Sequence, residues 1–192
     1  LPGETEGASG ALPDAPLTVS ARLVKIRAGP EVPGEVVVNK AGSASSSPEV
    51  AVSYIERTSG NIFTYLAQAK TLTRTSNRTI PGIQSASWLP NASSAFVRYL
   101  SGEDFSTINT YALPANGIGG FFLSQNLAGV AVSSAGVLLT TSGVNGSTVS
   151  LARTDGTRAS QIFTTSLSAI RTSFAGKNQY LVYTKPSATL PG

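Results

Sequence analysis

The sequence contains no cysteine, no histidine and no methionine. Without cysteine, neither a disulfide framework nor a thiolate site can form. Without histidine and cysteine, the chain cannot build a Ser-His-Asp or Cys-His catalytic group, and a structural zinc ion would lack its usual ligands. Dinucleotide-binding and Walker fingerprints are missing too, since Gly117-Ile118-Gly119-Gly120 has no third glycine at the required spacing. The sequence therefore predicts no cofactor and no metal.

Charged residues are scarce. They make up 12% of the chain, about half the usual share. Serine, threonine, glycine and alanine take their place, and this composition suits an all-β extracellular protein better than a helical cytosolic one. The formal net charge is +4, and from Phe105 onward the only acid is Asp155. The bases of that half are spaced singly, at Arg153, Arg158, Arg171, Lys177 and Lys185. Because nucleic-acid-binding surfaces cluster their bases, we expect no nucleic-acid partner.

Long apolar runs are absent as well. No stretch reaches the roughly eighteen apolar residues of a membrane span, and no charged segment precedes an apolar one as in a signal peptide. We therefore expect no membrane span in this chain. We also expect that it is exported, with its export or anchor segment removed, and that it is found outside the cell or on the cell surface.

What the chain does contain is a recurring stretch. It is clearest at residues 95–100, Ala-Phe-Val-Arg-Tyr-Leu, and similar runs lie at residues 52–58, 136–142 and 179–185. The step between them is about 41 to 43 residues, which is the length of one four-stranded propeller blade. In chain order, the first three runs reach a Ser-Gly pair, at residues 59–60, 101–102 and 142–143. This agreement between the spacing of the runs and the residues of the turns supports a true structural repeat.

Alternating apolar and polar residues between Gly-containing turns predict successive β-strands and no helix. The predicted strands are residues 17–26, 35–39, 50–58, 62–67, 70–75, 83–88, 95–100, 106–113, 127–133, 137–141, 147–153, 158–164, 167–174 and 180–184.

These strands predict one all-β domain over residues 17–192, preceded by a flexible Gly- and Pro-rich linker at residues 1–16. The domain consists of antiparallel four-stranded repeat units near residues 50–80, 81–126, 127–166 and 167–192, the last of them incomplete. A partial or small β-propeller is the first interpretation, and a β-sandwich is the alternative. A propeller needs at least four blades, and the sequence supplies about three and a half.

Three segments carry a resemblance to a known group of proteins. They are residues 52–63 (Val-Ser-Tyr-Ile-Glu-Arg-Thr-Ser-Gly-Asn-Ile-Phe), residues 74–83 and residues 86–100. Over residues 50–192 the chain resembles uncharacterised secreted bacterial proteins of the β-propeller type, akin to WD40-like and TolB-like repeats. The resemblance implies an exported propeller-like architecture, and it implies no particular activity.

Carboxylates are the remaining catalytic groups. A glycosidase needs two carboxyl groups about 5 to 9.5 Å apart, and the candidates are Glu56, Glu103, Asp104 and Asp155. The last three lie in predicted hairpin turns, where acids serve solvation and turn formation. The sequence therefore predicts no catalytic residue.

Candidates for a ligand-binding surface are Arg57, Arg98 and Tyr99. The two arginines stand at similar places in their units, each near an aromatic residue, and such a pair can stack on a ligand. Structural roles at strand edges are the alternative. Trp88, the single tryptophan, is interpreted as a core residue rather than a ligand platform.

The first functional hypothesis is a non-enzymatic, exported or surface-attached binding or scaffold module for an unknown protein or glycan. One alternative is a structural subunit that self-associates into a homo-oligomer through exposed strand edges. The other is a glycan-active enzyme that uses carboxylates.

Overall fold

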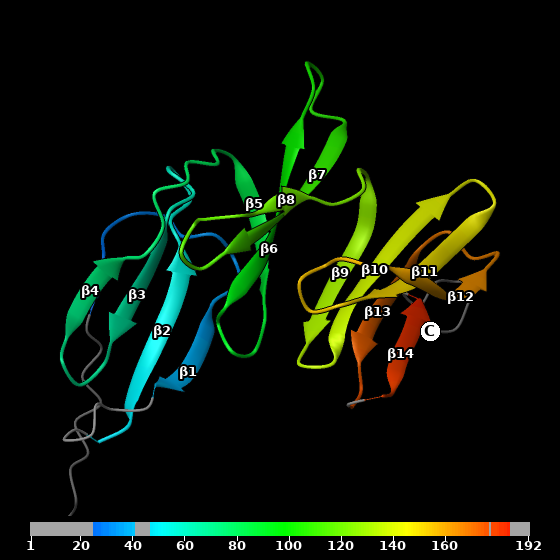
Figure 1. Cartoon of the computed structure of the whole chain (residues 1–192). Coiled ribbons are helices and arrows are strands. Elements are labelled where there is room, and N and C mark those ends of the chain that lie inside the picture. The colour runs from blue at the N-terminus through cyan, green and yellow to red at the C-terminus, as the bar shows by residue number, and fades with distance from the viewer. Residues whose placement is uncertain (1–24, 41–46, 177, 185–192) are drawn as a thin grey trace, which may run out of the picture.

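The computed structural model describes residues 25–40, 47–176 and 178–184, and all regular structure in these residues is β (Figure 1). Fourteen strands form four antiparallel sheets. Sheet 1 contains β1 (Val36–Lys40), β2 (Glu49–Ile55), β3 (Ile62–Leu66) and β4 (Thr71–Arg74). Sheet 2 contains β5 (Ile83–Trp88), β6 (Ser94–Ser101), β7 (Thr107–Pro114) and β8 (Phe121–Phe122). Sheet 3 contains β9 (Leu127–Ser133), β10 (Gly136–Gly143), β11 (Gly146–Ala152) and β12 (Ser160–Thr165), and sheet 4 contains β13 (Ile170–Phe174) and β14 (Tyr180–Thr184). The described residues include no helix that could cross a membrane.

Each sheet is a meander in which strands pair in chain order. The recurring stretch found in the sequence is the second strand of each sheet, namely β2, β6, β10 and β14. The predicted all-β, antiparallel class built of four-stranded units is therefore confirmed. Sheets 1, 2 and 3 have four strands each, and sheet 4 has two among the described residues.

The strand prediction differs from the structure in three places. The first predicted unit begins at residue 50, but β1 pairs with β2, with Val38 opposite Ala51, and so opens sheet 1. No strand was predicted at Phe121–Phe122, although β8 pairs there with β7. Of predicted strand 17–26, Lys25 and Ile26 lie outside any strand; residues 17–24, like the predicted linker 1–16, lie outside the described residues.

Period-two alternation lets one strand contribute to two cores. In β6, Ala95 and Val97 enter a first core, while Phe96 between them enters a second. In β10, Val137 and Leu139 enter the second core. The first core joins sheets 1 and 2 through Val32, Val36, Ile55, Ile62, Ile83, Ala86, Trp88, Ala95, Val97, Tyr111 and Leu113, and the second joins sheets 2 and 3 through Leu89, Phe96, Ala112, Leu127, Val137, Leu139 and Ala152.

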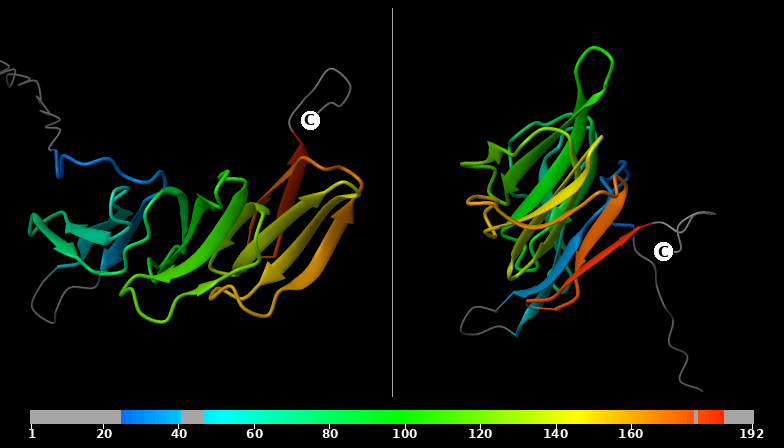
Figure 2. Two further views of the ribbon diagram at one scale, coloured as in Figure 1. Left: turned by 90° about the horizontal axis from the view of Figure 1, so that it is seen from above. Right: turned by 90° about the vertical axis from the view of Figure 1, so that its right-hand side faces the viewer.

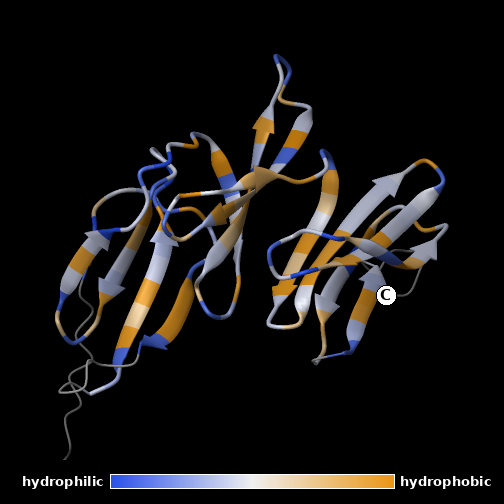
Figure 3. Ribbon diagram, in the orientation of Figure 1, coloured by the Kyte–Doolittle hydropathy of each residue, from blue (hydrophilic) through white to orange (hydrophobic). Residues whose placement is uncertain are grey.

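A third core lies between sheets 3 and 4, where Leu138 and Val149 pack with Ile170. Successive sheets are therefore stacked face to face in chain order, with sheets 1 and 4 at opposite ends of the row (Figures 1 and 2). Three consecutive interfaces exclude a two-layer sandwich and match the stacking of propeller blades. The alternation that produces this stacking is visible as apolar bands along the strands in Figure 3.

Polar contacts fix sheet 1 against sheet 2. The Trp88 indole N–H donates to the Gly34 carbonyl at 3.1 Å, and the Ala86 amide donates to the Pro33 carbonyl at 2.9 Å. Gly34 has φ 107°, and a Cβ there would lie 2.1 Å from the Ala86 oxygen. Only glycine permits this approach. Trp88 is buried, as predicted for a core residue.

Candidate binding site

A cavity of about 510 Å³ opens between the β4–β5 connection and the face of sheet 2 that looks toward sheet 1. We call it the linker pocket, after the β4–β5 connection that forms one of its walls. It is lined by Arg78, Thr79, Ile80, Pro81, Gly82, Tyr99, Leu100, Phe105, Tyr111 and Phe122. The segment between β4 and β5 supplies half of this lining, and the other half comes from β6, β7, β8 and the β6–β7 turn.

Strand register places three aromatic rings on one face. Val97 pairs with Tyr111, and Tyr111 pairs with Phe122, so these residues share a face of sheet 2. Tyr99 follows Val97 by two residues and lies on the same face. The Tyr111 and Phe122 rings meet edge to face with centroids 4.9 Å apart, a favourable aromatic geometry. The floor of the linker pocket is thus a fixed aromatic surface.

The connection that forms the opposite wall is tied down by backbone hydrogen bonds. The Thr75 amide donates to the Ile62 carbonyl at 2.9 Å, and the Ile80 amide donates to the Ser59 carbonyl at 3.1 Å. Between them, the Arg78 amide donates to the Ser76 hydroxyl at 3.2 Å. These contacts hold the backbone at Arg78 in place before any ligand binds.

Arg78 carries the charge of the linker pocket. Its guanidinium carbon lies 4.8 Å from the centroid of the Tyr111 ring, a cation–π distance. The residue is exposed, and within the described residues the ion pair that forms is between Arg27 and Glu56. The positive charge of Arg78 therefore faces solvent over an aromatic ring without a carboxylate partner among those residues.

Three of the side chains that line the linker pocket are large, apolar and exposed. Phe105 is 67% exposed, Phe122 is 59% exposed and Leu100 is 43% exposed. Phe105 also has φ 54°, which costs a non-glycine residue of the order of 1 kcal/mol. A bulky ring held in water on strained backbone is unfavourable for the isolated chain, and exposed apolar groups of this kind mark interaction sites.

The β6–β7 turn holds Phe105 in that position. The Phe105 amide donates to the Gly102 carbonyl at 3.2 Å, and the Ser106 amide donates to Asp104 Oδ1 at 3.1 Å. Hydrogen bonds from Ser106 lower the pKa of Asp104, so this carboxylate stabilises the turn. The turn belongs to a long hairpin that projects from sheet 2 (Figure 1).

The three residues singled out in the sequence have different environments. Tyr99 lines the linker pocket. Arg98 lies on the opposite face of β6, where it donates to the Leu127 carbonyl at 2.5 Å and where burial lowers its pKa. Arg57 follows the end of β2 and donates to Gln84 Oε1 at 3.2 Å. The two arginines are therefore not at equivalent positions, and Arg98 connects sheet 2 to sheet 3.

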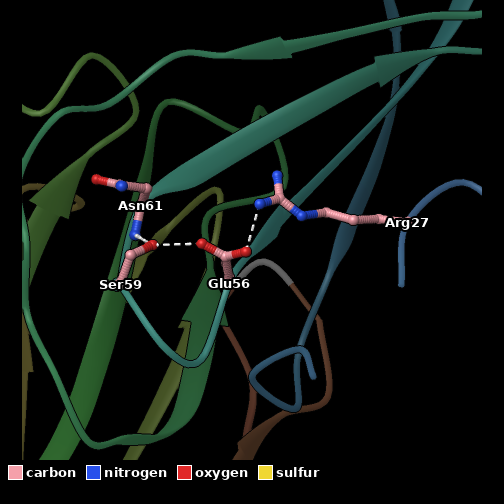
Figure 4. Close-up of polar contacts among 4 residues, drawn as sticks. All are labelled: Arg27, Glu56, Ser59 and Asn61. Atoms are coloured by element: carbon pink, nitrogen blue, oxygen red, sulfur yellow. Dashed lines mark hydrogen bonds and ion pairs between the residues drawn. The ribbon is translucent and has the colours of Figure 1, made fainter. Parts of the chain in front are cut away.

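The candidate carboxylates lie in three different turns, and Glu103 and Asp104 share the β6–β7 turn. Glu56 binds Arg27 and accepts a hydrogen bond from the Ser59 hydroxyl at 2.6 Å, while the backbone N–H of Asn61 donates to that hydroxyl at 3.2 Å (Figure 4). This network orders the β2–β3 turn. Asp155 accepts from the Thr157 amide and hydroxyl in the β11–β12 turn. Among the described residues, no three His, Cys, Asp or Glu side chains gather as metal ligands.

The sequence alone did not reveal Arg78, Phe105 or Phe122 as members of a site. The available signal was a phenylalanine inside the polar turn Gly102-Glu103-Asp104-Phe105-Ser106. A bulky apolar residue in such a turn has no core to enter.

Comparisons with known proteins give little further information. No protein-family model matches the chain, and no curated protein matches it significantly. Among solved structures it is similar to the N-terminal domain of Nup159, with 12% identity and a TM-score of 0.47. The match covers 72% of this chain and 38% of that one. Similarity at this level assigns neither a family nor a function.

Proposed function

We propose that this chain is a non-enzymatic binding module, exported or attached to a cell surface, that holds a protein partner in the linker pocket. The observation that carries the proposal is that the exposed, strained Phe105 lines the linker pocket together with Phe122 and with Arg78, which forms no ion pair among the described residues. Aromatic residues and arginine dominate the energetics of protein interfaces. The composition of the chain and its resemblance to secreted propeller-type proteins support the exported location.

A protein partner suits the linker pocket better than a glycan. A sugar ring carries many hydroxyl groups, and burying them is unfavourable unless the site supplies hydrogen-bond partners for them. The side chains that line the linker pocket include no amide and no carboxylate, and apart from Arg78 their polar groups are one threonine and two tyrosine hydroxyls. Apolar and aromatic contacts with one charge match a peptide segment.

Selection from a phage-displayed random peptide library tests this function. Peptides enriched on the chain should lose binding to a Phe105→Ser/Phe122→Ser double variant, because both changes remove apolar contact area from exposed positions. The matched control is Leu181→Ser, an exposed residue of sheet 4. Circular dichroism shows whether the variants keep the fold. Enriched peptides that bind the double variant as well as the original chain would refute the linker pocket as the binding site.

Self-association through a strand edge is the second candidate. On β14, Leu181 is 52% exposed and Tyr183 is 43% exposed, and a cavity of about 740 Å³ lies between this strand and sheet 3. A concentration series by light scattering tests this alternative. A constant monomer mass up to high concentration would exclude it.

A further inference from the structure

The linker pocket also indicates the chemistry of its ligand, and this inference rests on the proposed function. We propose that it selects an extended peptide segment in which a carboxylate side chain lies on the same face as an apolar side chain. Arg78 binds the carboxylate, and Phe122 and Phe105 contact the apolar group.

The charge argument comes from Arg78. Its guanidinium stands at the wall of the linker pocket, exposed and without a carboxylate partner among the described residues. Glu103 and Asp104 lie at the tip of the β6–β7 turn and are not among the lining residues. One guanidinium matches the single charge of a carboxylate, whereas phosphopeptides are usually bound by clusters of arginines.

The spacing of the two contacts fits an extended chain. The guanidinium carbon of Arg78 lies 4.8 Å from the centroid of the Tyr111 ring, and the centroid of the Phe122 ring lies 4.9 Å from it. Side chains two residues apart in a strand are separated by about 7 Å and point to the same side. A peptide with glutamate at one position and leucine two positions later would present both side chains to this face of sheet 2, where Arg78 and Phe122 border the same ring.

The edge of sheet 2 offers a backbone for such a peptide. The Leu123 amide donates to the Thr110 carbonyl at 2.9 Å, so the backbone at Leu123 is directed toward β7. Since hydrogen-bonding groups alternate along a strand, the N–H and C=O of Phe122 point away from β7. They stand at the outer edge of sheet 2 next to an exposed ring, an arrangement that accepts an added strand.

The test uses two blocked synthetic peptides, Ser-Glu-Thr-Leu-Thr-Phe-Ser and its counterpart with glutamine in place of glutamate. Each is titrated into the isotope-labelled full chain, and binding is followed by NMR shifts of the amides of Tyr99, Phe105 and Phe122. We expect the glutamate peptide to shift these signals and to bind roughly fivefold more tightly than the glutamine peptide, the scale of an exposed ion pair. This preference should shrink in high salt.

Variants of the chain separate charge from fold. Arg78→Gln should bind the two peptides equally, whereas Arg78→Lys should keep part of the preference because it keeps the charge. Arg171→Gln, an exposed change on β13, should leave the preference intact. Equal binding of both peptides to the original chain would overturn the proposed ligand chemistry. If neither peptide binds while library-selected peptides still require Phe105 and Phe122, the ligand chemistry fails and the binding function stands.

Discussion

Thr110 in β7 offers a stability test whose sign is opposite to that of most core substitutions. The residue is 0% exposed, and its hydroxyl has no hydrogen-bond partner among the described residues. An unpaired buried hydroxyl costs about 1–3 kcal/mol. Valine has nearly the same shape and favours strands. We therefore expect Thr110→Val to raise the free energy of unfolding by about 1 kcal/mol.

The matched control is Thr140→Val in β10. Thr140 is 1% exposed, but its hydroxyl lies 2.9 Å from the Thr172 hydroxyl and shares a hydrogen bond with it. The same substitution there removes a satisfied bond and leaves Thr172 without its partner, so it should lower the free energy of unfolding by about 1 kcal/mol. Two chemically identical changes are thus expected to have opposite effects.

Urea denaturation measures both variants, with the fluorescence of the buried Trp88 and far-UV circular dichroism as probes. The comparison is between midpoints at equal m-values, which reports stability alone. A loss of stability in Thr110→Val equal to that in Thr140→Val would refute the reasoning, because it would mean that the Thr110 hydroxyl is hydrogen-bonded in solution.

Three further substitutions test the turns and the shared core. Gly146→Ala should lower the free energy of unfolding in urea denaturation by about 3 kcal/mol or more, because Gly146 has φ 116° and an added Cβ would lie 2.0 Å from the Thr165 carbonyl oxygen. The control is Gly143→Ala, which should change stability little because a Cβ added at Gly143 would have no atom within 4 Å. Hydrogen bonds from Thr157 lower the pKa of Asp155 in the folded chain. The Asp155 carboxylate therefore stabilises the fold fully above its unfolded pKa of about 3.9, and this stabilisation is lost as the pH falls through the lower pKa of the folded state. The Asp155→Asn variant should therefore lose less stability than the original chain between about pH 5 and pH 2. Phe96→Ala removes a fully buried ring and should cost about 3–5 kcal/mol in thermal or urea unfolding.

Alternation and short apolar runs between turn residues predicted most strands, because burial on one face of a strand gives alternation and burial on both faces gives a continuous run. The predicted bounds of β5, β9 and β14 match the structure. The strand β8 was missed because two residues are too few to show a period. The assignment of β1 to sheet 1 was missed because pairing with β2 joins segments on either side of a polar stretch, and the sequence specifies no partner for a short apolar run.

Sequence patterns predicted little of the candidate site. Tyr99 was identified because aromatic residues near arginines are common at binding surfaces, but Arg98 beside it points to the other face of β6. The arginine that shares the linker pocket with Tyr99 is Arg78, 21 positions earlier in the chain. A connecting segment, a turn and an edge strand meet there only after sheets 1 and 2 have stacked.

The stacking of sheets has a consequence for how the molecule opens. Each apolar core is shared by two neighbouring sheets only, so the stability of the row is a sum of terms for single sheets and terms for adjacent pairs, as in a one-dimensional chain of coupled units. Sheets 2 and 3 have such a partner on both faces, whereas sheets 1 and 4 have one each among the described sheets. Amide hydrogen exchange should therefore be slowest in β6 and β10 and should quicken toward both ends, so that the row frays from its ends inward.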